Sequence, residues 1–368
     1  MNKMRKCIIW GAGKGGRQLL EQVQWLGYDV VAYCDMNPQL HGSKVENVPI
    51  IGKEEAVRLV CEDVTIEIIV GVLDSERAEE IRKIVKNEFP KNVVIRNGVN
   101  LSARHLAPLL VPVEIRHILA GKVALITGGG SGIGYAIAEL FLKAGCKCII
   151  AGRDRDKLLR AKESLCECED RDGIQVAVMD VLNVCELADV VEEAAHLFSE
   201  NRIDILINNA GVFTSKRIMN VSEDEYDMVM DTNLKGTVFM TQTMGRYMIG
   251  KKIRGHIVNI CSSTAFAPAY TPYQISKWAI RGFTLGAAKE LAPYGITVNA
   301  VAPGPTALTG MGTKVEGDSI YRGDLPSGRD TMPEEVAVAV LYLASGFADQ
   351  SVGEIFSLTG GDGNLVAR

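Results

Sequence analysis

The stretch that decides the fold reads Val123-Ala-Leu-Ile-Thr-Gly-Gly-Gly-Ser-Gly-Ile-Gly134 and continues into Tyr-Ala-Ile-Ala-Glu-Leu-Phe141. An apolar run that breaks into glycines and resumes as an apolar-rich helical pattern predicts a buried β-strand, a tight loop and an α-helix. Such a loop presents free backbone N–H groups and the positive end of a helix to a pyrophosphate. Gly128, Gly132 and Gly134 would let the phosphate approach the backbone closely. A glycine turn without a ligand is the alternative, and the strand-to-helix context argues against it.

A second signal lies farther along the chain, where Tyr273 and Lys277 stand four residues apart in Tyr-Gln-Ile-Ser-Lys. On a helix this spacing places both side chains on one face. A phenol titrates near pH ~10, and a neighbouring ammonium favours its phenolate, so the pair can carry acid/base chemistry near neutral pH. An isolated Tyr-x-x-x-Lys occurs by chance in many chains, and the motif therefore depends on its companions.

Polar amides follow a third apolar run. Residues 203–207 read Ile-Asp-Ile-Leu-Ile and are followed by Asn208-Asn-Ala-Gly211. Amides at the carboxyl end of a buried strand are costly unless they form hydrogen bonds. We therefore expect both asparagines to lie at the lip of a ligand crevice.

Together these motifs make residues 119–368 resemble the short-chain dehydrogenase/reductase family. Five motifs occur in the family's order: Thr127-Gly-Gly-Gly-Ser-Gly-Ile-Gly134, Asn208-Asn-Ala-Gly211, Asn233 in Asp-Thr-Asn-Leu-Lys-Gly, Ser262 in Asn-Ile-Cys-Ser-Ser, and Tyr273 with Lys277. The segments 298–304 and 353–361 look like the family's later strands. The resemblance implies an oxidoreductase that transfers hydride between a nicotinamide and a carbonyl or alcohol.

The resemblance gives four residues a role in catalysis. Tyr273 would donate a proton to the developing alkoxide during reduction, or remove one during oxidation, and Lys277 would lower the pKa of that phenol and hold the nicotinamide ribose. Ser262 would bond the substrate oxygen as charge builds on it, and Asn233 would anchor a water that connects the lysine to solvent. Ser263 is the alternative to Ser262, which lies only 11 residues before Tyr273. The position after Asn-Ile-x favours Ser262.

The end of the next apolar run, residues 146–151, determines the expected cofactor. An acidic residue there would hold the 2′-hydroxyl of NAD, whereas Gly152 followed by Arg153 leaves room for the 2′-phosphate of NADP and supplies its counter-charge. We therefore expect NADP(H) in preference to NAD(H). The alternative is that the Asp154 carboxylate serves NAD. The resemblance implies the following cofactor-binding residues: Thr127, Gly128, Ser131, Gly132, Ile133, Gly134, Arg153, Asp180, Val181, Asn209, Ala210, Gly211, Tyr273, Lys277, Pro303 and Gly304.

A second dinucleotide-type pattern opens the chain. A strand-like run over residues 6–10 leads into glycines, and the run over 29–34 ends at Asp35, 19 residues past Gly16. Residues 4–98 resemble the small Rossmann-type domain at the front of bacterial polysaccharide-biosynthesis proteins and of some sugar acyltransferases. A structural role or a second redox cofactor are alternatives to a ligand site. The expected nucleotide or nucleotide-sugar site consists of Gly11, Gly13, Lys14, Gly16 and Asp35.

The expected fold class is α/β, with two consecutive Rossmann-like, doubly wound parallel-sheet domains. We place the nucleotide- or nucleotide-sugar-binding domain at 1–98, a linker at 99–118 and the catalytic domain at 119–368. Pro108 and Pro112 oppose a helix in the linker. The glycine-rich stretch 305–330 occupies the position of the family's substrate lid, and its charged residues favour a polar substrate over a long acyl chain.

The expected substrate is a keto-sugar or a nucleotide-linked sugar in surface-polysaccharide synthesis, because of the resemblance of the first domain. Within enzymes, the alternative is a 3-oxoacyl thioester or a small ketone. From another class, the alternative is a protein that senses dinucleotides or acts as a scaffold without turnover. The presence of Asn233, Ser262, Tyr273 and Lys277 in one chain argues against a protein without turnover.

Composition bounds the remaining possibilities. A chain of 368 residues with 47% apolar residues can build two cores, and a net charge of −5 gives no electrostatic footprint for nucleic acid. The nine cysteines show neither a disulfide framework nor zinc spacing, and we expect no metal. No run approaches the ~20 apolar residues of a membrane span, and the first apolar run is too short for a signal peptide. We expect a cytoplasmic homodimer or homotetramer with no membrane partner.

Overall fold

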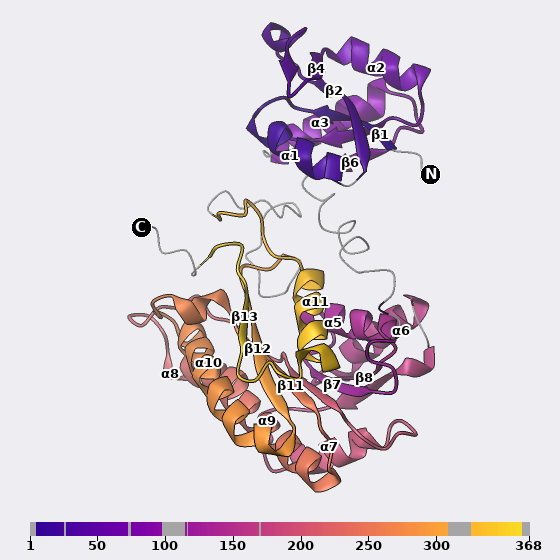
Figure 1. The fold of residues 1–368 in the computed structure, drawn as a ribbon. Coiled ribbons are helices and arrows are strands. Elements are labelled where there is room, and N and C mark those ends of the chain that lie inside the picture. The colour runs from indigo at the N-terminus through magenta and orange to yellow at the C-terminus, as the bar shows by residue number, and fades with distance from the viewer. Residues whose placement is uncertain are drawn as a thin grey trace. The chain divides into compact units, whose positions relative to one another are not determined.

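The structure of the chain, a computed structural model, describes residues 5–25, 27–72, 75–97, 115, 117–168, 171–307 and 325–362. These residues form two α/β units, each built on its own sheet, and both sheets are parallel apart from one antiparallel pair of strands in the first (Figure 1). The domain boundaries that the sequence predicts at residues 98 and 119 stay predictions, because the predicted linker lies largely outside the described residues. Most of the expected substrate lid, residues 308–324, also lies outside them.

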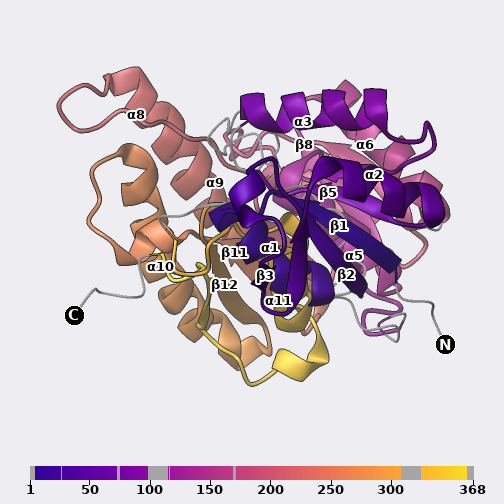
Figure 2. The same cartoon turned by 90° about the horizontal axis from the view of Figure 1, so that it is seen from above.

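The first unit contains a six-stranded sheet with the strand order β3-β4-β2-β1-β5-β6. Its elements are β1 (Arg5–Trp10), α1 (Lys14–Trp25), β2 (Tyr28–Cys34), β3 (Lys44–Val45), β4 (Val48–Ile51), α2 (Lys53–Glu62), β5 (Glu67–Val70), α3 (Ser75–Glu88) and β6 (Ile95–Asn97). One apolar cluster contains buried residues of α1, and another contains those of α2 and α3. Helices therefore cover both faces of the sheet, as expected for a doubly wound domain (Figure 2).

The hairpin of β3 and β4 is an element that the sequence analysis did not predict. The two strands pair antiparallel, and the turn residues Glu46 and Asn47 have φ angles of 49° and 71°. Two successive positive φ angles are typical of a type I′ turn, whose twist matches that of the strands. The usual Asn-Gly signal is missing from this turn, because Glu occupies the first position. Strand β6 (Ile95–Asn97) pairs parallel with β5 at the other edge of the sheet.

The second unit contains a seven-stranded parallel sheet with the order β13-β12-β11-β10-β7-β8-β9. Its first elements are β7 (Val123–Thr127), α5 (Gly132–Lys143), β8 (Lys147–Gly152), α6 (Arg155–Cys168), β9 (Ile174–Val178), α7 (Leu187–Ala195) and β10 (Ile205–Asn208). They continue with α8 (Glu223–Val229), α9 (Gly236–Lys251), β11 (His256–Ile260), α10 (Pro272–Leu291), β12 (Thr297–Pro303), α11 (Pro333–Leu343) and β13 (Ile355–Leu358).

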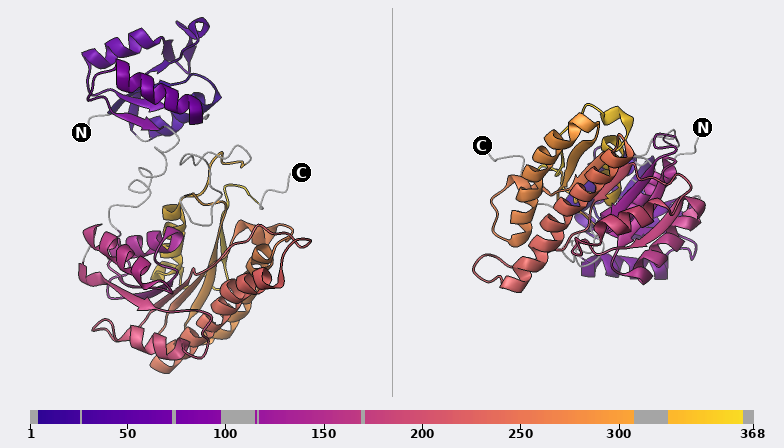
Figure 3. Two further views of the ribbon diagram at one scale, coloured as in Figure 1. Left: turned by 180° about the vertical axis from the view of Figure 1, so that it is seen from behind. Right: turned by 90° about the horizontal axis from the view of Figure 1, so that it is seen from below.

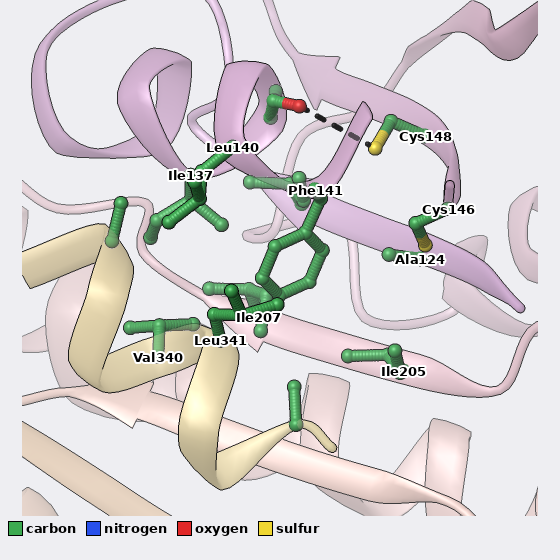
Figure 4. Packing of buried hydrophobic residues seen from close by; sticks show 14 of the residues in the cluster. Ala124, Ile137, Leu140, Phe141, Cys146, Cys148, Ile205, Ile207, Val340 and Leu341 are labelled. Carbon is green, nitrogen blue, oxygen red and sulfur yellow. Dashed lines mark hydrogen bonds between the residues drawn. The ribbon is translucent and has the colours of Figure 1, made fainter. Parts of the chain in front are cut away.

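Helices lie on both faces of this sheet (Figure 3), and an apolar cluster fills each face. Buried residues of α5, α6 and α11 cover one face, and those of α7, α9 and α10 cover the other. On the first face, Phe141 of α5 lies between β10 and Leu341 of α11 (Figure 4). Cys146 and Cys148 are 3% and 0% exposed in the same cluster, so they serve as small apolar filling.

The strand order determines where a ligand can bind. The chain runs outward from β7 through β8 to β9, then returns to β10 on the other side of β7 and runs outward in the opposite direction. In open α/β sheets a reversal of this kind marks the crevice in which ligands bind, so we expect that crevice at the carboxyl ends of β7 and β10. Within the described part of the chain, no helix combines the length and apolarity that a bilayer crossing needs.

Candidate active site

The glycine loop after β7 is tightly packed against the helix that follows it. Gly128 and Gly132 have φ angles of 67° and 55°, which side-chain-bearing residues rarely adopt. A Cβ atom at Gly134 would lie 2.5 Å from the Gly128 carbonyl oxygen and 2.6 Å from Asn209 Nδ2. Only glycine therefore allows α5 to approach the loop this closely, and the first turn of α5 points its N–H groups at the crevice.

A hydrogen-bond network ties the carboxyl ends of β7 and β10 together. The Thr127 hydroxyl donates to the Ile207 carbonyl over 3.2 Å and accepts from the backbone N–H groups of Asn209 and Ala210, both over 3.0 Å. Asn209 Nδ2 donates to the carbonyls of Thr127 and Gly128 over 3.0 and 3.2 Å. The Thr127 hydroxyl and the Asn209 Nδ2 group therefore shape the loop.

Asn208 differs from the expectation that both asparagines line the crevice. Its side chain is 5% exposed, and Nδ2 donates to Thr241 Oγ1 and Asn259 Oδ1, both over 2.9 Å. The amide is satisfied inside the domain, so burial carries no penalty here. The expectation was wrong for Asn208 because the two partners come from α9 and β11, which are remote in the sequence.

The end of β8 carries an exposed cation and a carboxylate with one engaged oxygen. Arg153 is exposed, whereas Asp154 Oδ1 accepts from the Lys157 backbone N–H over 2.9 Å at the start of α6. A Cβ at Gly130 would lie 3.5 Å from Lys157 Cγ, so the stem of this lysine runs beside the glycine loop. Asp154 acts as a helix cap in the structure.

The other predicted cofactor residues lie next to the carboxyl ends of strands of the same sheet or at the start of α5. Asp180 Oδ1 accepts from the Leu182 backbone N–H over 3.0 Å, and Val181 lies against Gly236, where a Cβ would be 2.7 Å from Val181 Cγ2. Gly304 follows β12, and its N–H donates to the Leu358 carbonyl over 2.8 Å. The remaining members are Ser131 and Ile133 at the start of α5, Gly211 after β10, and Pro303 at the end of β12.

Lys277 of α10 is buried, and its environment changes its acidity. The side chain is 7% exposed, and Nζ donates to the Ile260 carbonyl at the end of β11 over 2.7 Å. Burial lowers the pKa of Lys277 from 10.5 to about 8. The ammonium lies 5.6 Å from the centre of the Tyr273 ring, so the two motif residues share one helix face, as predicted.

Tyr273 lies one helical turn before Lys277, and its own burial dominates its acidity. Burial raises the pKa of Tyr273 above its usual value, while the hydrogen bond with the Ser262 side chain acts in the opposite direction. The sequence analysis expected the ammonium to lower this pKa, and the net direction in the structure is upward. The ring packs edge-on against Phe213 with 5.1 Å between the ring centres, and Phe213 is 48% exposed.

The two candidate serines have different partners. Ser262 hydrogen-bonds with Tyr273, and its Oγ accepts from the backbone N–H and the hydroxyl of Thr264 over 3.2 and 3.1 Å. Because its lone pairs are engaged, the Ser262 hydroxyl can act as a donor at the crevice. Ser263 instead donates to Asp362 Oδ2 over 2.6 Å. This geometry favours Ser262, as the sequence does.

Asn233 lies in an irregular part of its helix. Residues 230–235 form a π-helical segment between α8 and α9, a distortion that often occurs at functional sites. Asn233 is fully buried, its Oδ1 accepts from the Val212 N–H over 2.7 Å, and its Nδ2 donates to the Val212 carbonyl over 2.9 Å. Nδ2 also reaches Ser276 Oγ of α10 over 3.3 Å. The expected role as a water anchor stays a prediction.

The first unit also has a glycine loop at the carboxyl end of β1. Gly11 has a φ of 106°, and a Cβ at Gly16 would lie 1.6 Å from the Gly11 carbonyl oxygen, so α1 presses on the loop. Asp35 Oδ2 accepts from the Ala12 N–H over 2.7 Å, and Oδ1 accepts from the Asn37 N–H over 2.9 Å. Asp35 therefore orders the loop, and a ligand role for its carboxylate would require additional bonds.

The remaining predicted residues of this loop are Gly13 and Lys14. Gly13 is exposed, and a Cβ there would meet nothing within 4 Å. Lys14 begins α1, and its side chain lies outside the described atoms. Among the residues described in both units, no group of three or more His, Cys, Asp or Glu side chains could hold a metal ion.

The sequence analysis missed three residues around Tyr273 and the serines. Phe213 and Thr264 are each within two residues of a recognised motif, and an aromatic or hydroxyl side chain at such a position is the signal that could have found them. Asp362 lies 99 residues from Ser263 and carries no local signal.

Comparisons with known proteins agree with this geometry. Residues 122–319 match the family model described as short chain dehydrogenase, and residues 2–98 match the model described as CoA binding domain. The resemblance of the first domain to polysaccharide-biosynthesis proteins stays a prediction.

Similar sequences and structures extend over nearly the whole length of the relatives. The 3-oxoacyl-[acyl-carrier-protein] reductase FabG of Aquifex aeolicus is 39% identical over 249 residues, which are 66% of this chain and 98% of the relative. An uncharacterized oxidoreductase of Staphylococcus aureus is 35% identical over 65% of this chain and 97% of its own length. A crystal structure of a short chain dehydrogenase from Bacillus anthracis matches with a TM-score of 0.62 and 33% identity, covering 68% of this chain and 100% of that one.

Lys277 gives the stability of the unliganded protein a characteristic pH dependence. Between its folded pKa of about 8 and its ordinary value of 10.5, the unfolded chain binds more protons at this residue than the folded chain does. The contribution of this group to stability therefore rises as the pH increases through that window. We expect the free energy of unfolding of the native chain, minus that of Lys277→Met, to increase by about 1 to 3 kcal/mol between about pH 8 and about pH 10.

Denaturant unfolding at several pH values measures this difference. Lys289→Met, at an exposed position of the same helix, controls for the loss of one positive charge. The free energy of unfolding of the native chain, minus that of Lys277→Met, could instead stay constant or fall as the pH rises. Such a result would show that the environment of Lys277 does not disfavour its charged form.

Proposed function

The chain belongs to the short-chain dehydrogenase family, and from this we propose an NADP(H)-dependent oxidoreductase in which Tyr273 exchanges the proton with the substrate oxygen. The observation that carries the proposal is the convergence of Ser262, Tyr273 and Lys277: Ser262 bonds Tyr273, and the Lys277 ammonium lies 5.6 Å from the centre of the Tyr273 ring. A protein that only senses dinucleotides would need the glycine loop but not this acid/base set.

The residues of the second unit fit a dinucleotide. The Gly128–Gly134 contact leaves the backbone bare where a pyrophosphate would lie, and Ser131 caps α5 without a side-chain hydrogen bond. When bound, the nicotinamide would supply or accept the hydride. We assign the other contacts with the cofactor to the remaining cofactor-binding residues that the sequence predicts.

The chain's own residues would handle the proton and the developing charge. Ser262 would donate a hydrogen bond to the substrate oxygen, because Thr264 occupies its acceptor sites. Tyr273 would give its proton to the same oxygen during reduction. Lys277, fixed by the Ile260 carbonyl, would offset the charge of the resulting phenolate. Asn233 would hold α10 in position through Ser276.

The preference for NADP(H) rests on the end of β8. One oxygen of Asp154 is engaged as a helix cap, whereas the exposed Arg153 guanidinium is available to the ribose. Lys157 lies beside the glycine loop and adds a second cation on the same side. A 2′-phosphate is better matched to two cations than a 2′-hydroxyl is.

Two substrate classes follow from different observations. A keto-sugar or nucleotide-linked sugar in surface-polysaccharide synthesis follows from the resemblance that we infer for the first domain. A 3-oxoacyl thioester is favoured by the name of the Aquifex aeolicus relative and by the half-exposed Phe213 ring beside Tyr273. The match of residues 2–98 to a CoA binding domain is compatible with a thioester that carries a nucleotide.

Assembly and location stay proposals. Ile275, Trp278 and Leu285 of α10 are exposed and would be covered in a homodimer or homotetramer that uses this helix. We also propose a cytoplasmic location.

The proton-transfer role predicts the behaviour of Tyr273→Phe. NADPH oxidation is first measured with acetoacetyl-CoA and with a UDP-linked 4-keto sugar, and the better substrate is kept. We expect Tyr273→Phe to lower kcat by about 10²- to 10⁴-fold, the contribution typical of a general acid. Binding of NADPH, measured by fluorescence, should change little. If Tyr273→Phe retains the kcat of the native chain, the phenol is not the proton donor.

The cofactor preference predicts the behaviour of Arg153→Ala. The native chain should have a higher kcat/KM with NADPH than with NADH. Arg153→Ala should lower kcat/KM for NADPH by about tenfold or more and change kcat/KM for NADH little, because the lost contact is to the phosphate. The dissociation constant of 2′,5′-ADP should rise in parallel. Arg155→Ala, at an exposed arginine two residues away, is the control. A native preference for NADH would overturn the assignment.

We further propose that the first unit binds a nucleotide at its glycine loop, and Gly13→Val is the test. Among the described residues, a Cβ at Gly13 meets no atom within 4 Å, so the variant should fold normally and block only the approach of a ligand. Calorimetric titration of the full chain with coenzyme A and with a UDP-sugar should show binding of one of them, weakened about tenfold or more in Gly13→Val. Equal affinity in both chains would place that ligand elsewhere.

A further inference from the structure

A carboxylate from the end of the chain reaches the serine pair beside Tyr273. Ser263 is 2% exposed, and its hydroxyl donates to Asp362 Oδ2 over 2.6 Å. A hydrogen bond from a buried hydroxyl to a carboxylate is among the stronger side-chain bonds. Without Asp362, the Ser263 hydroxyl would lose the acceptor that the structure gives it.

Asp362 is held in place by the segment before it. After β13, Gly360 and Gly361 have φ angles of 60° and 96° and turn the chain. The Asp362 N–H donates to the Thr359 carbonyl over 2.9 Å, and the Ser327 N–H donates to the Gly360 carbonyl over 2.9 Å. The carboxylate is therefore presented from an ordered turn and can act as a fixed anchor.

Ser263 connects this anchor to Ser262. Ser262 is the cap of a short 3₁₀ turn over Ser263–Phe266, and Ser263 is the first residue of that turn. The Ala265 N–H donates to the Ser262 carbonyl over 3.0 Å, so the turn and the serine move together. A displacement of Ser263 would therefore change the direction of the Ser262 hydroxyl, which bonds Tyr273.

We propose that Asp362 is a positioning residue for the reaction, acting through Ser263 to hold the Ser262 hydroxyl toward Tyr273 and the substrate oxygen. This inference rests on the proposed function, because it assigns Asp362 to the same site. It also gives a reason why Ser262, and not Ser263, would serve the reaction: the only hydroxyl proton of Ser263 is already donated to Asp362.

A double-mutant cycle on Ser263 and Asp362 tests the inference, with the better of the two carbonyl substrates and NADPH. Asp362→Ala and Ser263→Ala should each lower kcat by about tenfold, a loss of ~1.4 kcal/mol of transition-state stabilisation. KM for NADPH should change less than twofold in both variants. The double variant should be no slower than the slower single variant, because both changes remove one bond.

Asp362→Asn is the conservative variant, since its amide oxygen can still accept from Ser263, and it should recover most of the native kcat. Ser327→Ala is the matched control, because Ser327 holds Gly360 through its backbone N–H, and it should keep the native kcat. If Asp362→Ala does not fold, Ser263→Ala and Asp362→Asn still decide the question.

Native kcat in Asp362→Ala or in Ser263→Ala, or losses that multiply in the double variant, would overturn the inference. Failure of the proposed function has a different signature, because Tyr273→Phe would then retain activity. If Tyr273→Phe is inactive while both Asp362→Ala and Ser263→Ala are fully active, only the positioning role falls.

Discussion

One buried hydrogen bond, from the Lys277 ammonium to the Ile260 carbonyl, determines how the rest of the site is arranged. It ties α10 to the carboxyl end of β11 over 2.7 Å. Ser262 lies two residues beyond Ile260, and Tyr273 lies one helical turn before Lys277, so the same bond places serine and phenol beside each other. A single neutral acceptor does not replace the hydration of an ammonium, which is why burial lowers the pKa of Lys277 to about 8.

The strand ends supply the other half of the site. In a parallel sheet all strands finish at one edge, and the order β11-β10-β7-β8 brings residues of four strands to one crevice. Thr127 and Asn209 join β7 to β10, and Asn233 joins the segment after β10 to α10. Lys277, Asn233 and Asn209 are each held by backbone groups of another element, so these three side chains are fixed before any ligand binds.

The features that the sequence predicts well are those encoded by neighbouring residues. The glycine loop before α5 and the helical spacing of Tyr273 and Lys277 are local patterns, and the two parallel sheets follow from alternating strand-like and helix-like runs. The features that it missed depend on partners far away in the chain. Asn208 is buried because Thr241 and Asn259 bond it, 33 and 51 residues away.

Two further features could not be predicted from neighbouring residues alone. The turn of the β3–β4 hairpin uses Glu46 where glycine or asparagine would be the usual signal, so its type I′ geometry follows from strand pairing and not from composition. The upward direction of the Tyr273 pKa follows from burial, which the spacing of two residues on a helix does not encode.

The most direct test of the central claim is to follow the hydride itself. The chain is incubated with NADPH deuterated at C4 on either face and with ethyl 3-oxobutanoate as a carbonyl probe, and the product is analysed by NMR. The account predicts deuterium on the carbinol carbon from one of the two labelled faces and none on the other carbons. Reduction of the probe with deuterium absent from the carbinol carbon for both labels would contradict direct hydride transfer at the crevice that Ser262, Tyr273 and Lys277 form.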